Sequence, residues 1–100
     1  MNLSEFRSTL TADKPPEGIS GGLSALWHDG KEDWESAHTI AQDIDTPDGA
    51  WVHAYLHRKE GDPGNARYWY NRAGKAMPAY ALEKEWDEIV STLLKARSGL

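Results

Sequence analysis

The spacing of apolar side chains along the sequence predicts an all-α chain. Apolar residues recur every three or four positions over most of the length, as on one face of a helix, and no segment alternates as a half-buried strand does. A short N-terminal helix is predicted around Leu3, Phe6 and Leu10. We predict four further, main helices, which span residues 31–45, 47–60, 63–76 and 79–97.

Turn residues predict that neighbouring main helices pack as antiparallel hairpins. Thr46-Pro47 and Asp62-Pro63 each place a capping residue before a proline, which fits the first turn of a helix. Gly61 is typical of the residue that follows a helix. Because the predicted connections are only two or three residues long, consecutive helices must turn back on one another. The predicted fold class is therefore an array of antiparallel helical hairpins.

The chain is expected to form a single domain, residues 1–100, because a domain usually takes about 100 to 200 residues. Residues 1–22 are predicted to form the short N-terminal helix and a loop or arm, since two prolines and three glycines follow the helix there. Residues 23–97 are predicted to form the helical core.

Two segments differ from an ordinary helix with one apolar face. The first is a short apolar stripe from Ile19 to Trp27, which ends at Asp29-Gly30 and is not counted among the main helices. The second is the helix over residues 47–60, whose apolar side chains cover most of its circumference. A helix of that kind is buried on several sides, so its histidines are expected to face other helices rather than water.

Composition excludes several classes of function. Sixteen acidic and eleven basic residues give a net charge of −5, which argues against a broad surface for nucleic acid. The chain has no cysteine, which excludes disulfide frameworks, thiol catalysis and cysteine-ligated zinc. No apolar run approaches the roughly 18 residues that a membrane-spanning helix needs. We therefore expect a cytoplasmic protein with no membrane or nucleic-acid partner.

The segment from Gly61 to Gly74 resembles the second helix of a tetratricopeptide or Sel1-like repeat. In such repeats a turn glycine precedes an alanine, an aromatic pair, a basic residue and a second alanine. The matching residues here are Gly61, Ala66, Trp69, Tyr70, Arg72 and Ala73, with a weaker echo at Gly30, Trp34, Ala37 and Ala41. The resemblance implies a helical-hairpin array with a concave protein-binding surface. Because two hairpins fall short of the three or so repeats that usually form a stable stack, a homodimer is expected.

A second resemblance covers the segments 34–38, 53–62 and 65–70. Together they are similar to a family of small helical proteins with no assigned activity. This resemblance therefore implies no catalytic residue.

Counting residues outward from the predicted turns places three aromatic side chains at one level. In a hairpin about Asp45 and Thr46, His38 lies level with His53 and Trp34 lies level with His57. In a hairpin about Gly61 and Asp62, Tyr70 lies level with His53. One predicted layer therefore holds His38, His53 and Tyr70, and the next, about 5.4 Å away, holds Trp34 and His57.

This layer predicts a candidate metal site. His53 and His57 are four residues apart and share a helix face, and Glu60 lies on the same side. With His38 from the neighbouring helix, these side chains form a donor set for zinc or a similar divalent ion. The alternative is that the histidines are partly buried groups hydrogen-bonded to tyrosine, carboxylate or backbone partners.

The same region also predicts a metal-free pocket for a small anionic or aromatic ligand. Tryptophans would form its walls, and His53 or His57 would act as a catalytic general acid or base. The predicted ligand-binding residues are His38, His53, His57, Arg58, Asn65, Tyr70 and Arg72. The alternative is that the aromatic rings are core residues and that the arginines pair with acidic neighbours such as Glu60 or Asp62.

Two classes of function follow from these patterns. The first, which the sequence favours, is a non-catalytic interaction module whose exposed aromatic and arginine surface binds a protein, a peptide or a second copy of the chain. The second is a small-ligand-binding protein or metal-dependent enzyme centred on His38, His53 and His57.

Overall fold

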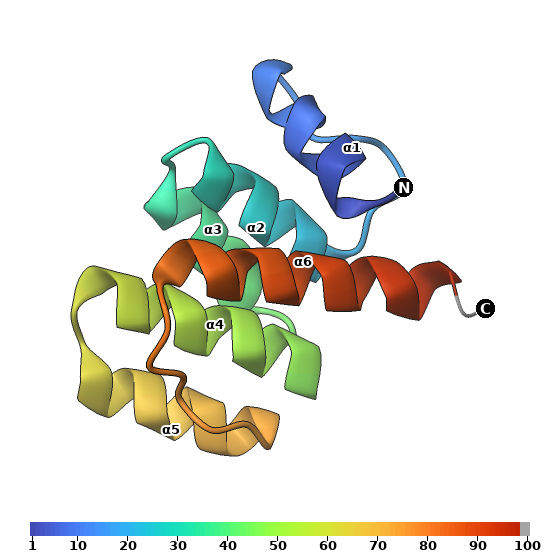
Figure 1. Ribbon diagram of the computed structural model, residues 1–100. Coiled ribbons are helices and arrows are strands. Elements are labelled where there is room, and N and C mark those ends of the chain that lie inside the picture. The colour runs from blue at the N-terminus through green and yellow to red at the C-terminus, as the bar shows by residue number, and fades with distance from the viewer. Residues whose placement is uncertain (99–100) are drawn as a thin grey trace.

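A computed structural model describes residues 1–98, and over this range the chain is all-helical, with no strand (Figure 1). The elements are α1 (Leu3–Ser8), the 3-10 turn η1 (Thr9–Thr11), α2 (Gly21–Gly30), α3 (Trp34–Gln42), α4 (Pro47–Glu60), α5 (Pro63–Ala73) and α6 (Leu82–Ser98). The all-α class predicted from the sequence is confirmed. Among the described residues, no helix is both long and apolar enough to cross a bilayer.

The prediction of four main helices is wrong by one, because α2 is a full helix of 10 residues. Glycines at both ends of α2 disfavour a helix, so the sequence indicated only a short apolar stripe there. Tertiary burial offsets the low helix propensity of glycine here, since Leu23, Ala25 and Leu26 are completely buried. Gly22 serves this packing, because a Cβ atom at that position would lie 2.9 Å from Leu93 Cδ1 of α6.

Four other predicted helix boundaries lie too far out, and one of them is the end of α3, which is at Gln42 rather than at residue 45. α3 begins at Trp34 rather than at residue 31, since the Asp33 side chain accepts a hydrogen bond from Ser36 N and caps the helix there. α5 ends at Ala73 rather than at residue 76, because Gly74 adopts a left-handed conformation with φ of 72°. α6 begins at Leu82 rather than at residue 79, after a connecting segment whose Tyr80 carbonyl accepts a hydrogen bond from Arg58.

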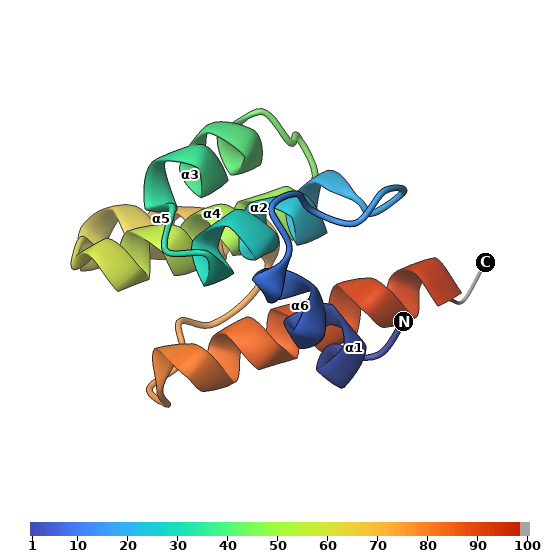
Figure 2. The same ribbon diagram turned by 90° about the horizontal axis from the view of Figure 1, so that it is seen from above.

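Helix α4 lies at the centre of the fold and packs against α2, α3, α5 and α6. Its neighbours α3 and α5 each run antiparallel to it, as Figures 1 and 2 show. Every residue from Gly49 to His57 is buried. The sequence-based prediction that this helix is buried on several sides, with its histidines facing other helices, is confirmed.

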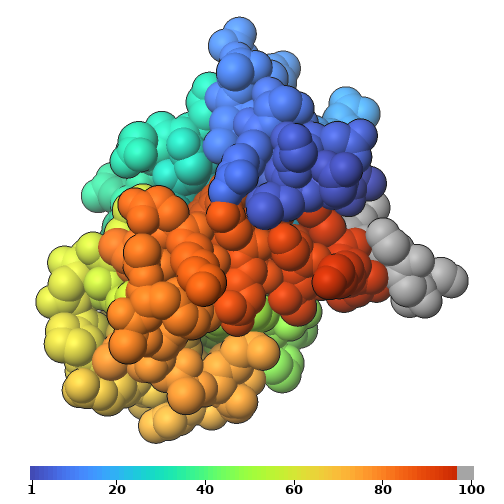
Figure 3. All heavy atoms as spheres, viewed as in Figure 1, coloured from blue at the N-terminus to red at the C-terminus, as the bar shows by residue number. Residues whose placement is uncertain are grey.

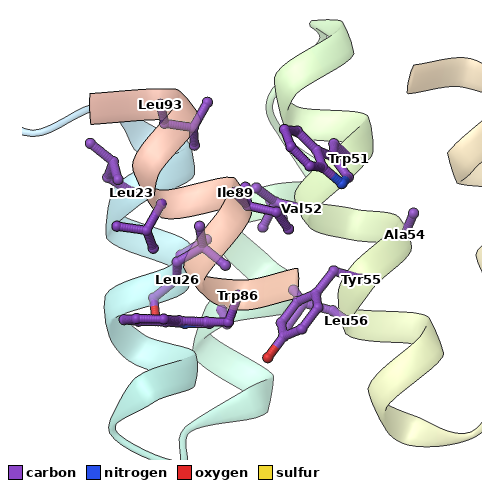
Figure 4. Close-up of a cluster of buried hydrophobic side chains, with 14 of the residues drawn as sticks. Leu23, Leu26, Trp51, Val52, Ala54, Tyr55, Leu56, Trp86, Ile89 and Leu93 are labelled. Carbon is purple, nitrogen blue, oxygen red and sulfur yellow. The ribbon is translucent and has the colours of Figure 1, made fainter. Parts of the chain in front are cut away.

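The apolar core lies between α2, α4 and α6 (Figure 4). Leu26 of α2, Val52 of α4 and Ile89 of α6 are all completely buried within it. Trp86 closes one end of the cluster, where its Nε1 donates a hydrogen bond of 3.0 Å to the Leu26 carbonyl. Buried side chains of α3 and α5, among them Ala41 and Ala66, continue the same cluster around α4.

Helix α1 extends this core on the outer side of α6. Phe6 is completely buried, and its ring centroid lies 5.9 Å from that of Trp86. Figure 3 shows the N-terminal segment, in blue, lying directly against α6, in red. The first helix thus contributes a core side chain, and the loop that follows it leads into α2.

A close turn between α3 and α4 brings these two helices into register. Gly49 lies in the first turn of α4, and a Cβ atom there would be 2.4 Å from the carbonyl oxygen of Ile44. Only glycine permits so close an approach. This turn sets the level at which α3 side chains meet α4 side chains, and so positions the site described next.

Candidate functional site

Three histidines meet where α3 packs against α4. His53 and His57 project from α4 and are 5% and 6% exposed, while His38 of α3 is half-buried. His38 Nε2 and His53 Nε2 lie 3.0 Å apart, as the predicted level of the two residues requires. One ring nitrogen from each of the three imidazoles lies within 4.8 Å of the other two. The fourth histidine, His28, lies at the end of α2 and is not part of this group.

Two tryptophans hold the imidazole rings in place. Trp34 stacks on His38 with ring centroids 4.9 Å apart, and its Nε1 is anchored by a hydrogen bond of 2.8 Å to the Leu56 carbonyl. Trp69 of α5 stacks on His53 at 4.0 Å. Trp34 also meets His57 edge-on at 6.1 Å, which confirms that these two residues are level. Stacking against a tryptophan restricts the rotation of the His38 and His53 rings and fixes the direction of their nitrogens.

His57 is oriented by polar neighbours at the α4–α5 turn. Its Nδ1 lies 2.5 Å from Glu60 Oε2, and its Nε2 lies 3.4 Å from Asn65 Nδ2. In the tautomer that donates from Nδ1 to the carboxylate, the Nε2 lone pair accepts from the Asn65 amide, so an ion bound at Nε2 would replace this contact. Glu60 favours this tautomer of His57, and it lies outside the group of three imidazoles, in a second potential donor group with His57 and the exposed Asp62.

The environment keeps at least two of the imidazoles neutral at pH 7. Burial, together with the neighbouring His57 and His38 rings, lowers the pKa of His53 to about 4. Burial and His57 also lower the pKa of His38 below its ordinary value. A neutral imidazole has a lone pair to offer to a metal or a hydrogen-bond donor. As a general base, by contrast, a group with a pKa near 4 is weak at pH 7.

The structure divides the seven predicted ligand-binding residues into separate groups. Asn65 contacts His57, one of the three histidines. Tyr70 does not contact them, because it points towards α6, where its hydroxyl donates a 2.6 Å hydrogen bond to Glu85. Arg58 pairs with the same carboxylate at 2.9 Å. Arg72 is exposed and donates to the Tyr68 hydroxyl. The pairing of Arg58 and Arg72 with Glu60 or Asp62 that the sequence suggested does not occur among the described contacts.

The position predicted for Tyr70 fails for a reason of helix geometry. Tyr70 is level with His53, but successive residues on a helix point about 100° apart. Trp69 therefore faces the histidines, while Tyr70 faces α6 and is 1% exposed. Level positions bring side chains together only when both also point into the same interface.

Sequence reasoning missed two buried carboxylates. Glu85 is 1% exposed and accepts hydrogen bonds from Trp51, Arg58 and Tyr70. Asp29 is 2% exposed, accepts from the Tyr55 hydroxyl at 2.8 Å and pairs with Lys59. The signal for Glu85 was its spacing, because it lies four residues before Ile89 on the apolar face of its helix.

Comparison of the chain with protein-family models, curated proteins and solved structures finds no match.

Proposed function

We propose that the protein binds one divalent transition-metal ion through His38, His53 and His57. The observation that carries the proposal is the convergence of three imidazole nitrogens, from two helices, within 4.8 Å of one another. Imidazole is the nitrogen ligand that proteins use for zinc, copper, nickel and iron. The surrounding tryptophans and the turn at Gly49 hold the rings in this arrangement before any ion arrives.

The distances suit a tetrahedral ion with little movement. Zinc–nitrogen bonds of about 2.0 Å place two ligand nitrogens about 3.3 Å apart in a tetrahedral site. The Nε2 atoms of His38 and His53 are 3.0 Å apart, so the two rings need to move apart only slightly to bind the ion. Three histidines leave one position for water or another ligand, which is the pattern of catalytic rather than structural zinc sites.

Protonation and orientation support the same proposal. Because His38 and His53 have lowered pKa values, an ion would displace little proton from them at pH 7. The contact between Glu60 and His57 matches the carboxylate–histidine–metal arrangement, in which a carboxylate fixes the tautomer and raises the basicity of the ligand. Glu60 therefore acts through His57, and in this proposal it is not a direct ligand.

Metal titration of protein purified without an affinity tag and stripped with a chelator tests the proposal. We expect Zn²⁺, Co²⁺ or Ni²⁺ to bind with a stoichiometry of one. At a free ion concentration of about 100 times Kd, binding stabilises the fold by about 2.7 kcal/mol, which raises the Tm of a domain this size by about 10 °C. His38→Gln should remove most of that rise, because it deletes one of three ligands at a half-buried position.

His28→Gln is the matched control, since it changes a half-buried histidine outside the cluster. It should leave both the stoichiometry and the rise in Tm unchanged. The absence of stoichiometric binding by the parent protein would overturn the proposal. Equal metal binding by the parent and His38→Gln would overturn it as well, and would leave the three histidines as a hydrogen-bonded packing group.

We also propose that α5 presents a protein-binding surface, as in a tetratricopeptide-like or Sel1-like hairpin. Its main packing partner is α4, and its other side is exposed, with Tyr68 52% exposed beside Arg72. Arg67 and Lys75 lie on the same helix or just beyond it and are exposed as well. Cations and an exposed ring on an acidic chain favour an acidic partner, and a second copy of the chain, with its net charge of −5, is one.

Analytical ultracentrifugation tests this surface. We expect a dimer whose dissociation constant rises when Arg72→Glu reverses the charge, while Lys14→Glu, an exposed control in the N-terminal loop, has no effect. A monomer at all accessible concentrations would contradict self-association. The cytoplasmic location expected from the sequence stands as part of this proposal, and cell fractionation would test it.

A further inference from the structure

Asn65 of α5 contacts the histidine group through its side-chain amide. Its Nδ2 lies 3.4 Å from His57 Nε2, and no other hydrogen bond of this side chain is found among residues 1–98. The backbone N–H of Asn65 donates to the side chain of Asp62, which caps the helix. The start of α5 is therefore fixed without the Asn65 amide, which makes its one side-chain contact at the histidines.

The Asn65 side chain links the buried imidazoles to solvent. Asn65 is exposed, whereas His57, which it contacts, is only 6% exposed. The other ring nitrogen of His57 faces Glu60, and Trp34 lies edge-on to the same ring at 6.1 Å. A small solute that approaches His57 Nε2 along α5 therefore meets the Asn65 amide.

An ion held by the three histidines would place its fourth ligand within reach of this amide. Because zinc–nitrogen bonds are about 2.0 Å long, an ion on His57 Nε2 lies no more than about 5.4 Å from Asn65 Nδ2. A ligand atom that is bonded to the ion and accepts a hydrogen bond places the ion about 4 to 5 Å from the donor. Rotation of the Asn65 side chain is thus enough to make this hydrogen bond.

The chemistry of the site makes Asn65 a donor rather than a fourth metal ligand. Amide carbonyl oxygens suit hard cations such as Mg²⁺ and Ca²⁺, whereas imidazoles suit zinc, copper and nickel. The Asn65 amide also presents its N–H to His57, because Nε2 of that ring is the acceptor when Nδ1 donates to Glu60. When an ion takes the Nε2 lone pair, the same N–H becomes available to the ligand on the ion.

The charges around the site favour a monovalent anion as that ligand. A divalent ion carries two positive charges, and the three neutral imidazoles offset neither of them. Glu60 Oε2, 2.5 Å from His57 Nδ1, offsets one. Asp62 is exposed, so water and salt screen its charge. One uncompensated positive charge at a largely buried position is costly, and a single negative charge on the fourth ligand removes that cost.

We propose that the fourth position on the ion binds a small monovalent anion, which accepts a hydrogen bond from the Asn65 amide. This inference rests on the proposed metal site and adds to it the chemistry of the exchangeable ligand. Tryptophan rings already cover His38 and His53, so the anion has only a few atoms. Asn65 then contacts the bound anion directly and acts on the metal only through it.

Azide titration of the Co²⁺-loaded protein tests the proposal, because the visible absorption of Co²⁺ reports its coordination. The protein is purified without an affinity tag, loaded with Co²⁺ and freed of excess ion. We expect azide to change the spectrum saturably, with one azide per ion. Perchlorate has the same charge but coordinates metals weakly, so at equal ionic strength it should leave the spectrum unchanged.

Asn65→Ala separates binding of the anion from binding of the ion. It should weaken azide binding about tenfold, which is the effect of one hydrogen bond to a charged group. It should change the Co²⁺ affinity by less than about threefold, because all three histidines remain. The Tm of the metal-free protein should stay within about 3 °C, since the side chain is exposed. Asn71→Ala, at an exposed asparagine on the same helix, is the matched control and should alter neither affinity.

Failure of this proposal can be distinguished from failure of the metal site. Absence of Co²⁺ binding by the parent protein would overturn both. Co²⁺ binding without a response to azide would overturn the anion site alone, as would azide binding by Asn65→Ala that is as tight as in the parent. A loss of Co²⁺ affinity in Asn65→Ala as large as that in His38→Gln would show that Asn65 is a direct ligand, and would overturn its role as a donor.

Discussion

Replacing Glu85 by glutamine is expected to lower the free energy of unfolding by about 3 kcal/mol. The carboxylate is 1% exposed and accepts hydrogen bonds from Arg58, Tyr70 and Trp51. The amide keeps the shape but removes the charge that compensates Arg58, whose side chain is only 17% exposed. In either orientation its N–H groups also face a donor, which is Arg58 in one and Trp51 with Tyr70 in the other. A domain of this size is stable by about 5 to 15 kcal/mol, so the loss is a large fraction of the total.

The three donors depend on this one acceptor. Burial and the hydrogen bond to Glu85 raise the pKa of the Tyr70 hydroxyl far above its ordinary value, so the hydroxyl remains a donor. Arg58 also donates to the carbonyl of Tyr80 and thus ties the segment before α6 to α4. Loss of the carboxylate therefore loosens the contact of α4 with α5 and with α6 together.

Urea unfolding measures the effect as a shift of the midpoint at unchanged m value. Glu35→Gln, an exposed glutamate on α3, should change stability by no more than about 0.5 kcal/mol. The double variant Arg58→Met/Glu85→Gln should be less unstable than the sum of the single variants, because it leaves no unpaired buried charge. A loss below 1 kcal/mol for Glu85→Gln would show that the cluster is solvated rather than buried.

The second large effect is a loss of stability in mild acid that depends on His53. In the unfolded chain its pKa is about 6.5, and in the folded protein burial and the neighbouring histidines lower the pKa to about 4. Between these values the unfolded state binds a proton that the folded state does not. The free energy of unfolding is therefore fully retained above about pH 6.5 and falls as the pH drops towards 4, by up to about 3 kcal/mol.

Carboxylates also titrate in this range, so the effect of His53 is read from a variant. In metal-free buffer, the loss of stability between about pH 7 and pH 4.5 should be smaller in His53→Gln than in the parent by about 2 kcal/mol. His28→Gln should show the parental pH dependence, because it lies outside the cluster. Equal pH dependence in His53→Gln and the parent would mean that His53 is protonated as easily in the fold as in the unfolded chain.

Much of the helical architecture was predictable because its signals are local. Thr46 and Asp62 each cap a helix whose next residue is proline, and Gly61 ends α4 with φ of 89°. These features act over three or four residues and leave a direct trace in the sequence. Helix α2 also begins at a capping residue, since the Ser20 side chain accepts a hydrogen bond from Leu23 N, but two glycines follow this cap and obscure it. Its apolar stripe was visible in the sequence, but the stripe is short and the helix of 10 residues has glycine at both ends.

The candidate site was predictable only in part. Counting from the turn correctly placed His38 opposite His53 and Trp34 near His57, since two short antiparallel helices must bring such residues level. The same count failed for Tyr70, where the direction of the side chain decided the contact. Asn65 lies beside His57 because the two residues stand on either side of the short connection between α4 and α5.

The sequence by itself determined the helices with capped ends and the burial of α4. It also determined that a metal site here would use histidine and not cysteine. The tertiary structure alone decided which polar side chains share a partner. In the folded chain His53 stacks on Trp69. Tyr70 and Arg58 instead share the carboxylate of Glu85. Local propensities fix where a helix begins and ends, whereas the direction in which its side chains point into an interface depends on the rotation of each helix about its own axis. That rotation is set by the packing of the whole core.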